Sequence, residues 1–256
     1  MSREREELAR QAAQVRALHR PGNPLLLPNA WDAASARLVA GAGFPVIATS
    51  SGAVADSLGY EDDNSMPAQE AFAAVSRISA NVSLPVTADM EAGYGLSPED
   101  FVDRLLAAGA VGCNLEDTDH RGSGLVDAEG HAARLGAVKA AAKKAGVDIV
   151  LNARVDVPLR GKPAPDLIAE AIRRARLYRA AGADCVYPIF LDDEKAIANF
   201  VEAVDSPVNI LLLKGDLGDV ARIGGLGAAR VSMGSGLRSV ADEAVKTALA
   251  RLRLAN

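Results

Sequence analysis

The sequence predicts an α/β fold of the (β/α)8 TIM-barrel class, and three observations carry this prediction. The chain has 256 residues, which suits one barrel better than two ordinary domains. An Ala-rich helix end, a glycine and a short β-rich run recur together along the chain. Eight apolar runs of this kind are each bounded on both sides, as strands buried on both faces are. We therefore expect a single domain over residues 1–256.

The expected strands alternate with helical patterns. The strands are Leu25–Pro28, Val46–Thr49, Pro85–Asp89, Gly112–Glu116, Ile149–Arg154, Cys185–Pro188, Val208–Leu212 and Arg230–Met233. Between them, Asp166–Ala181 places apolar residues on one helical face, and Ser97 followed by Pro98 is typical of a helix start. This alternation favours a parallel barrel, with a doubly wound open sheet as the alternative.

Four glycines stand between a helical pattern and the strand that follows it. They are Gly41, Gly109, Gly146 and Gly182. Glycine is favoured just past a helix end because it adopts the left-handed conformation without a Cβ clash. We expect each of the four to end a helix in this way.

Two segments lie outside the repeat. Residues before Pro24 form an extra helical pattern, which we expect to cover the bottom of the barrel or a neighbouring chain. Residues Val240–Leu254 form an amphipathic helical pattern after the last strand. Its apolar stripe consists of Val240, Ala244, Val245, Ala248, Leu249 and Leu252.

Composition narrows the classes of partner. Hydrophobic residues make up 49% of the chain, charged residues make up 24%, and the net charge is −5. A net negative chain lacks the basic face that nucleic acid or an anionic membrane requires. No apolar run approaches the roughly 20 residues of a membrane span, and the charged first residues lack the apolar core of a signal peptide. Cys113 and Cys185 stand in apolar runs, as buried free thiols do. We expect a cytoplasmic protein that binds a small molecule.

Acidic residues collect where three neighbouring strands end. Asp89 and Glu91 follow the third expected strand, and Glu116 ends the fourth. Active sites of such barrels lie at the carboxyl ends of the strands, so these carboxylates should converge and repel one another unless a cation neutralises them. Oxygen ligands without His or Cys favour Mg²⁺ or Mn²⁺. The alternative is that the carboxylates cap helices and pair with surface lysines.

Other strand ends supply groups suited to an anionic substrate. The guanidinium of Arg154 can hold a carboxylate with two hydrogen bonds, although an internal salt bridge to Asp156 or Glu116 is the alternative. Gly52, after Ser50 and Ser51, would let backbone N–H groups approach a substrate oxygen closely. Asn209 also stands at a strand end and is a further candidate for substrate binding.

These residues resemble a known superfamily. The stretch PVTADMEAGYG (Pro85–Gly95), with Asn114–Asp117 and Asn152–Arg154, resembles the isocitrate lyase/phosphoenolpyruvate mutase superfamily. The stretches PNAWDAASARLVAGAGFPVIATSSG and LGYEDDN match its opening, and the likeness runs from about Pro28 to Gly236. The resemblance implies a metal-dependent barrel that makes or breaks C–C or P–C bonds next to a 2-oxo acid, through an enolate-type intermediate.

The resemblance also implies a role for each site residue. Asp89 would be the principal metal ligand and a substrate contact, with Glu91 and Glu116 acting through water. Asp62, in the LGYEDDN loop, would lie near the metal and the reacting group. Arg154 would hold the substrate carboxylate. The carboxylate and oxo group would be bound by Ser50, Ser51 and Gly52.

Two loops depart from the family pattern. The lyase loop with Lys-Lys-Cys-Gly-His or Lys-Arg-Cys-Gly-His is missing, and neither cysteine follows the fourth expected strand. The Lys/Asn-bearing gating loop of the phosphonopyruvate mutases is replaced by Thr118–His131. Ile189 and Phe190 stand where a substrate-facing histidine is expected. Within the replaced loop, His120 is the candidate acid/base, the alternative being an exposed histidine without a role.

The retained and altered parts together predict an activity. We expect a Mg²⁺-dependent enzyme that cleaves a C–C bond next to a small 2-oxo carboxylate through a metal-stabilised enolate, as a decarboxylase or lyase. The main alternative is a phosphorylmutase or hydrolase acting on a P–C bond of a phosphonate. A phosphate-binding barrel, suggested by GGLGAARVSMGSG, and a non-catalytic paralogue are further alternatives. The family's exchange of C-terminal helices implies a homo-oligomer, expected to be a tetramer.

Overall fold

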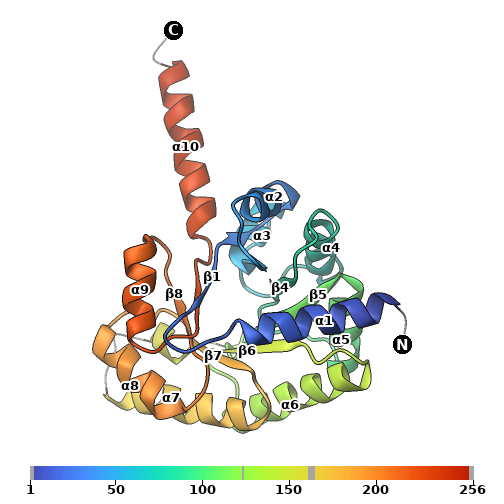
Figure 1. Cartoon of the computed structure of the whole chain (residues 1–256), viewed down its shortest axis with the longest axis vertical. Helices are drawn as coiled ribbons and strands as arrows, with labels where there is room; N and C mark the ends of the chain where they lie inside the picture. Colours follow the sequence, from blue (N-terminus) through green and yellow to red (C-terminus); the bar gives the residue numbers. More distant parts are fainter. Residues whose placement is uncertain (1–2, 123, 161–164, 254–256) are drawn as a thin grey trace.

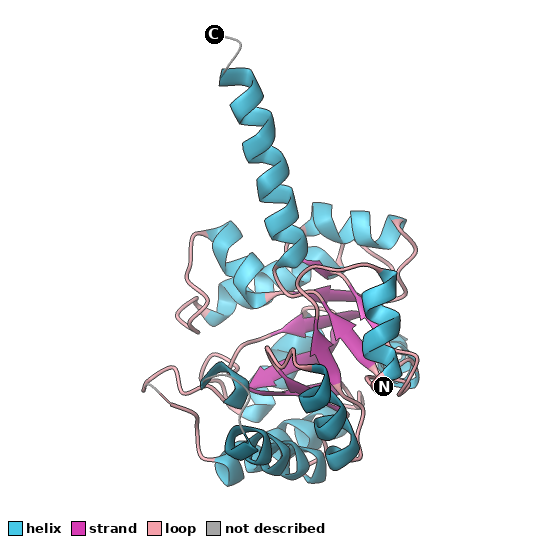
Figure 2. Cartoon of the chain, turned by 90° about the vertical axis from the view of Figure 1, so that its left-hand side faces the viewer, coloured by secondary structure: helices cyan, strands magenta, loops and turns pink. Residues whose placement is uncertain are grey.

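Strands occupy the centre of the molecule and helices lie around them (Figures 1 and 2). The structure, a computed structural model, describes residues 3–122, 124–160 and 165–253. The strands are β1 (Leu25–Leu27), β2 (Asn29–Ala30), β3 (Ile47–Thr49), β4 (Val86–Asp89), β5 (Ala110–Glu116), β6 (Val150–Val155), β7 (Cys185–Pro188), β8 (Asn209–Leu211) and β9 (Arg230–Ser232).

Helices follow the strands in alternation. They are α1 (Arg3–Ala17), α2 (Ala33–Gly41), α3 (Ser51–Leu58), α4 (Ala68–Ser79), α5 (Pro98–Ala107), α6 (Ala128–Lys144), the 3-10 helix η1 (Val157–Arg160), α7 (Pro165–Ala180), α8 (Glu194–Val204), α9 (Leu217–Gly225) and α10 (Gly236–Arg253). This order confirms the predicted α/β class, since every pairing between the named strands is parallel.

The strands form two parallel sheets that adjoin. One has the order β2-β3-β4-β5-β6-β7, and the other has the order β1-β9-β8. Pro28 separates β1 from β2, because it has no N–H to donate to the ladder. A parallel bridge between Val186 and Val208 joins β7 to the segment that enters β8. The two sheets therefore adjoin at both ends, with the carboxyl ends of their strands on one side.

The predicted helix signals are confirmed with one exception. The side chain of Ser97 accepts a hydrogen bond from the Asp100 N–H, and Pro98 opens α5. Gly109, Gly146 and Gly182 have φ of 80°, 84° and 107°, as expected after a helix. Gly41 does not, because α2 runs through it and the left-handed residue of that turn is Gly43, with φ of 87°.

Helix α1 covers the amino ends of the strands. This confirms the expectation that the first segment covers the bottom of the barrel. The guanidinium of Arg16 pairs with Asp184, just before β7, and donates to the carbonyl of Asp148, just before β6. Its apolar face, including Leu8 and Val15, is buried. The carboxyl ends of the strands lie on the opposite side and are not covered by α1.

Helix α10 extends away from the rest of the molecule (Figures 1 and 2). It begins at Gly236, earlier than predicted, and the predicted last residue Leu254 lies outside the described residues. Its apolar stripe is exposed at Val240, Val245, Leu249 and Leu252. Among the described helices, none is long and apolar enough to cross a membrane.

Candidate active site

A cavity of about 510 Å³ opens at the carboxyl ends of the strands. It brings together seven of the predicted site residues from five different segments. They are Ser50, Ser51, Asp62, Asp89, Glu116, His120 and Arg154. The strand-end positions converge because parallel strands β3 to β6 deliver their last residues to the same side.

Three predicted residues do not line this cavity. Glu91 is buried behind it, and Asn209 is fully buried with its amide nitrogen donating to the Ser232 hydroxyl. Gly52 is the second residue of α3, and a Cβ there would lie 2.9 Å from a carboxylate oxygen of Asp62. A side chain at this position would therefore push Asp62 from its place.

The carboxylate of Asp89 is held by groups from two neighbouring elements. One oxygen accepts hydrogen bonds from the backbone N–H and the hydroxyl of Ser51, at 3.2 and 3.0 Å. The other accepts from the amide nitrogen of Asn114 at 3.1 Å. Because Ser51 opens α3, the carboxylate lies at the positive end of the helix dipole.

A buried polar chain fixes Asn114 in turn. The amide oxygen of Asn114 accepts from the amide of Asn152 at 2.8 Å and from Arg230 at 3.3 Å. Its NH₂ group must therefore face Asp89. Arg230 is 1% exposed and forms no ion pair in the described part of the chain, so burial lowers the pKa of its guanidinium. Sequence reasoning missed Arg230, although a lone arginine in the apolar run AARVSM was a signal.

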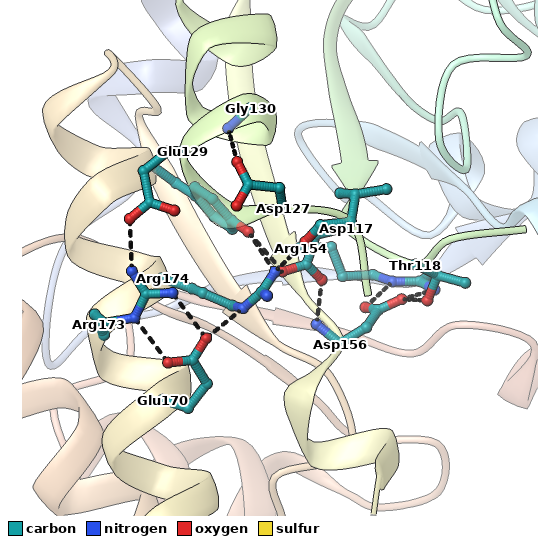
Figure 3. Close-up of polar contacts among 12 residues, drawn as sticks. Asp117, Thr118, Asp127, Glu129, Gly130, Arg154, Asp156, Glu170, Arg173 and Arg174 are labelled. Atoms are coloured by element: carbon teal, nitrogen blue, oxygen red, sulfur yellow. Dashed lines mark hydrogen bonds and ion pairs between the residues drawn. The ribbon is translucent and has the colours of Figure 1, made fainter. Parts of the chain in front are cut away.

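Arg154 is both an internal ion-pair partner and a wall of the cavity. Its Nε and Nη2 donate to the carboxylate of Asp156 at 2.7 and 2.8 Å (Figure 3). Nη2 also pairs with Glu116. The Thr118 hydroxyl donates to the same Asp156 carboxylate at 2.5 Å. The internal salt bridge that was the alternative for Arg154 is thus present. The Nη1 atom of Arg154 has no partner among the described residues.

Asp117 has a structural role on the far side of this pair. It is fully buried and accepts from the Asp156 N–H, the Tyr178 hydroxyl and the Arg174 guanidinium (Figure 3). Burial nevertheless raises the pKa of Asp117. This residue links α7 to the strand ends β5 and β6 and does not line the cavity.

His120 faces the cavity and contacts the carboxylate of Glu116 at 2.5 Å. Its loop folds back on itself, with an antiparallel bridge between Thr118 and Leu125 and a hydrogen bond from the Val126 N–H to the Asp117 carbonyl. The hydrogen bond to Glu116 raises the pKa of His120, which favours the imidazolium. Residue 123 of this loop lies outside the described residues.

Glu91 ties the LGYEDDN loop to the strand ends. Its carboxylate accepts from the Asn64 N–H and, at 2.9 Å, from the Tyr94 hydroxyl. The Asn64 side chain accepts from the Tyr94 N–H at 3.1 Å. All three residues have positive φ, of 48°, 62° and 53° for Glu91, Asn64 and Tyr94, a strain that clusters at functional sites. This arrangement places Asp62, two residues before Asn64, at the cavity.

Negative charge is crowded around the cavity. Burial, followed by repulsion from Asp89, raises the pKa of Asp62. Burial raises the pKa of Glu91 to about 7, although the Tyr94 hydroxyl opposes it. Burial also raises the pKa of Glu116 against the opposing effect of Arg154. An additional positive charge between Asp62 and Asp89 would relieve this repulsion.

The donor set suits a hard divalent cation held partly through water. Within the described residues, no three acidic, histidine or cysteine side chains come close enough to surround an ion by themselves. Mg²⁺ is commonly held by one or two carboxylates and keeps several waters. Asp89, which lines the cavity, could hold such an ion directly, while Asp62 and Glu116 are placed to contact its waters.

Comparison with known proteins identifies the family. The model of the phosphoenolpyruvate phosphomutase family matches residues 15–253. The chain belongs to this family. It is 34% identical over 218 residues to an uncharacterized protein of Mycobacterium tuberculosis, covering 85% of this chain and 80% of that protein. It is 30% identical over 213 residues to 2-methylisocitrate lyase of Escherichia coli, covering 75% of this chain and 70% of that enzyme.

A solved structure supports the same family. A Burkholderia cenocepacia protein described as a candidate phosphonomutase shares 37% identity and a TM-score of 0.89, covering 95% of this chain and 99% of that one. The expected superfamily of phosphoenolpyruvate mutases and isocitrate lyases is thus confirmed. Its members are lyases or phosphomutases that act on C–C or P–C bonds, and they typically depend on divalent metals.

Proposed function

We propose that this phosphoenolpyruvate phosphomutase family member is a divalent-metal-dependent lyase. It cleaves a C–C bond next to the 2-oxo carboxylate of a small acid, as a decarboxylase or lyase. The observation that carries the proposal is the meeting of Asp62, Asp89, Arg154 and His120 at one cavity beside the first turn of α3. One small anion in this cavity can then contact carboxylate groups, the Arg154 guanidinium and the His120 imidazole.

The substrate carboxylate binds between Arg154 and the start of α3. The Nη1 edge of Arg154 meets the carboxylate, while Asp156 and Glu116 hold the other edge in place. The hydroxyls of Ser50 and Ser51, at the start of α3, bind the carboxylate and oxo oxygens. A helix start favours negative charge, so it stabilises the oxygen as charge develops.

Asp89 would hold Mg²⁺ or Mn²⁺ directly, and Glu91 and Glu116 would act at longer range through water. When bound, such an ion polarises the oxo group and favours negative charge on its oxygen. Ser51 and Asn114 keep the Asp89 carboxylate oriented for this role, because both donate to it. Asp62 faces the same space and carries a raised pKa, which suits proton exchange with the reacting group.

His120 supplies the proton that completes the reaction. In a decarboxylation, the C–C bond breaks, the distal carboxylate leaves as CO₂, and the bonding electron pair remains as the enolate of the oxo acid. The carbon that lost its substituent then takes a proton from the His120 imidazolium, which Glu116 stabilises. This assignment favours C–C cleavage because a proton must be delivered, whereas a phosphoryl shift within one molecule requires none.

Product analysis tests the proposal. Oxaloacetate, a 2-methylmalate-type acid and phosphonopyruvate are incubated with enzyme and Mg²⁺, and products are followed by ¹H and ³¹P NMR. We expect a C–C substrate to be consumed, with turnover lost in EDTA. Rearrangement of phosphonopyruvate to phosphoenolpyruvate, with no C–C substrate consumed, would instead support the second candidate, a phosphorylmutase. The phosphorylmutase is favoured by the match to the phosphoenolpyruvate phosphomutase family.

A further inference from the structure

The cavity has a second wall of different chemistry. Most of its charged side chains come from β4, β5, the loop after β5, β6 and the LGYEDDN loop, whereas η1, β8 and the segments after β7 and β8 supply large apolar ones and one lysine, Lys214. We call the latter the apolar wall. It consists of Leu159, Ile189, Phe190, Leu211 and Leu213.

Much of the apolar wall is open to solvent. Phe190 is 48% exposed, Leu159 is 43% exposed and Leu213 is 41% exposed. Single exposed apolar residues are ordinary, but three large ones around one cavity form a patch that favours contact with an apolar group. The patch adjoins the charged groups directly, so one small molecule can contact both walls.

The backbone of this wall is set before any ligand binds. Phe190 has φ of 59°, which a bulky side chain rarely adopts. A Cβ at Gly236 would lie 2.0 Å from the carbonyl oxygen of Leu213, so only glycine permits this approach of α10 to the segment after β8. Such strain at a cavity indicates that the positions of Phe190 and Leu213 serve a function.

The positive groups of the cavity are poorly placed for a second anion. Among its described lining residues they are Arg154, His120 and Lys214. Arg154 is paired with Asp156 and Glu116, and His120 is bonded to Glu116. Lys214 is exposed at the rim. A carboxylate or phosphonate against the apolar wall would lose hydration and could gain only this solvent-exposed cation, whose attraction water screens, as a partner.

We propose that the apolar wall binds a short alkyl substituent of the substrate. The enzyme would then select substrates that carry, besides the bond to be cleaved, an alkyl substituent that reaches this wall, rather than a carboxylate or phosphonate at that position. This inference rests on the proposed function, because the carboxylate and oxo group anchor the molecule at the charged wall. Each added methylene that reaches the wall should tighten binding about fourfold.

A matched ligand series tests this inference in the Mg²⁺-loaded full chain. Oxalate, pyruvate, 2-oxobutyrate and 2-oxopentanoate form a series of increasing length, and 2-oxoglutarate replaces the end of the last with a carboxylate. Binding is measured by calorimetry. We expect affinity to rise about fourfold from 2-oxobutyrate to 2-oxopentanoate, and 2-oxoglutarate to bind at least roughly tenfold more weakly than 2-oxopentanoate.

Substitutions in the apolar wall test whether it causes the dependence of affinity on chain length. Phe190→Asn removes apolar surface while keeping a residue that tolerates positive φ, so it should abolish the dependence on chain length and leave oxalate binding unchanged. Leu159→Asn makes the same test without touching that backbone. Leu217→Asn is the matched control, because Leu217 is 76% exposed and does not line the cavity.

The possible outcomes separate this inference from the proposed function. Mg²⁺-dependent oxalate binding without any dependence on chain length would overturn the inference alone. Equal or tighter binding of 2-oxoglutarate, lost in Lys214→Ala, would overturn it in favour of a dianionic substrate. No binding of oxalate or of any oxo acid would overturn both.

Discussion

Arg154 has to hold two internal carboxylates and an incoming one at the same time. Arg154→Lys keeps the charge but cannot span Asp156 and Glu116 while offering a second edge to a substrate. We expect kcat/KM to fall about 100-fold or more, roughly 2.7 kcal/mol of transition-state stabilisation. Steady-state kinetics would measure this loss, with Arg173→Lys on the exposed face of α7 as control. Near-normal kinetics would show that Arg154 acts only as an internal ion-pair partner.

Asp117 should matter for stability rather than for substrate binding. In Asp117→Ala, the guanidinium of Arg174 and the hydroxyl of Tyr178 lose a buried partner. We expect the free energy of unfolding to fall by about 3–5 kcal/mol, because the Tyr178 hydroxyl, the Asp156 N–H and one Arg174 N–H lose a buried acceptor, at about 1–3 kcal/mol for each unsatisfied group. Urea denaturation measures it. Glu129→Ala, at the exposed Arg173 pair of Figure 3, should change the value by less than about 0.5 kcal/mol. Equal effects of the two substitutions would contradict the structural role of Asp117.

The sequence predicted the positions of some site residues but not of others. Asp89, Glu116 and Arg154 were predictable because each ends a strand, and parallel strands end on one side. Asp62 came only from the family resemblance, since its loop reaches the cavity through Glu91 and Asn64. The lone Arg230 in an apolar run was a signal of a buried cation, but its partner could not be predicted, because Asn114 is far away in the sequence and is brought close only by the fold.

At the scale of helices, one buried histidine follows α1 and another lies in α6. The Nδ1 of His19, just after α1, donates to the carbonyl of Val15, and His131 in α6 packs edge-on against Tyr178 in α7. Burial, more than any charge, lowers the pKa of each to about 4. Both imidazoles are therefore neutral in the folded chain at neutral pH.

These two histidines should consequently make the folded chain less stable in mild acid. The unfolded chain takes up protons near pH 6.5 and the folded chain only near pH 4, so the contribution is complete above about pH 6.5 and is lost as the pH falls toward 4. Between pH 7.5 and pH 5, we expect each histidine to lower the free energy of unfolding by about 2 kcal/mol. The raised pKa values of Glu91 and His120 oppose this loss in the wild type, so the difference between wild type and His131→Phe, from denaturation at both pH values, measures it: from pH 7.5 to pH 5 the variant should lose about 2 kcal/mol less than the wild type. An unchanged pH dependence in His131→Phe would contradict this account.

The positions of the helices and strands were predicted better than the residues that line the cavity. Strand and helix positions agree because buried apolar runs and the caps at Ser97 and Gly109 are local signals. The short strand β2 was not predicted, since Pro28 divides what the sequence presents as one run. The apolar wall depends on backbone turns at Phe190 and Gly236, which no local pattern specified.

For the whole molecule, α10 leaves an apolar stripe without cover. Val240, Val245, Leu249 and Leu252 are each more than half exposed on a helix that projects from the body (Figure 1). Such a stripe favours burial against a second copy of the chain. We therefore expect a homo-oligomer, with a tetramer as the expected size. Sedimentation at micromolar concentration measures it, and Leu249→Asp should shift it toward smaller species. A wild-type monomer would contradict the proposal.

The central claim is that Asp89 couples a divalent cation to a small carboxylate ligand. Thermal unfolding with oxalate, with and without Mg²⁺, tests it most directly in wild type and Asp89→Asn. Ligand at about 100 times its Kd stabilises the native state by roughly 2.7 kcal/mol, or about 5–10 °C for a chain of this size. We predict this shift in the wild type only when oxalate and Mg²⁺ are both present, and no shift in Asp89→Asn. An equal shift without metal, or in Asp89→Asn, would contradict the account.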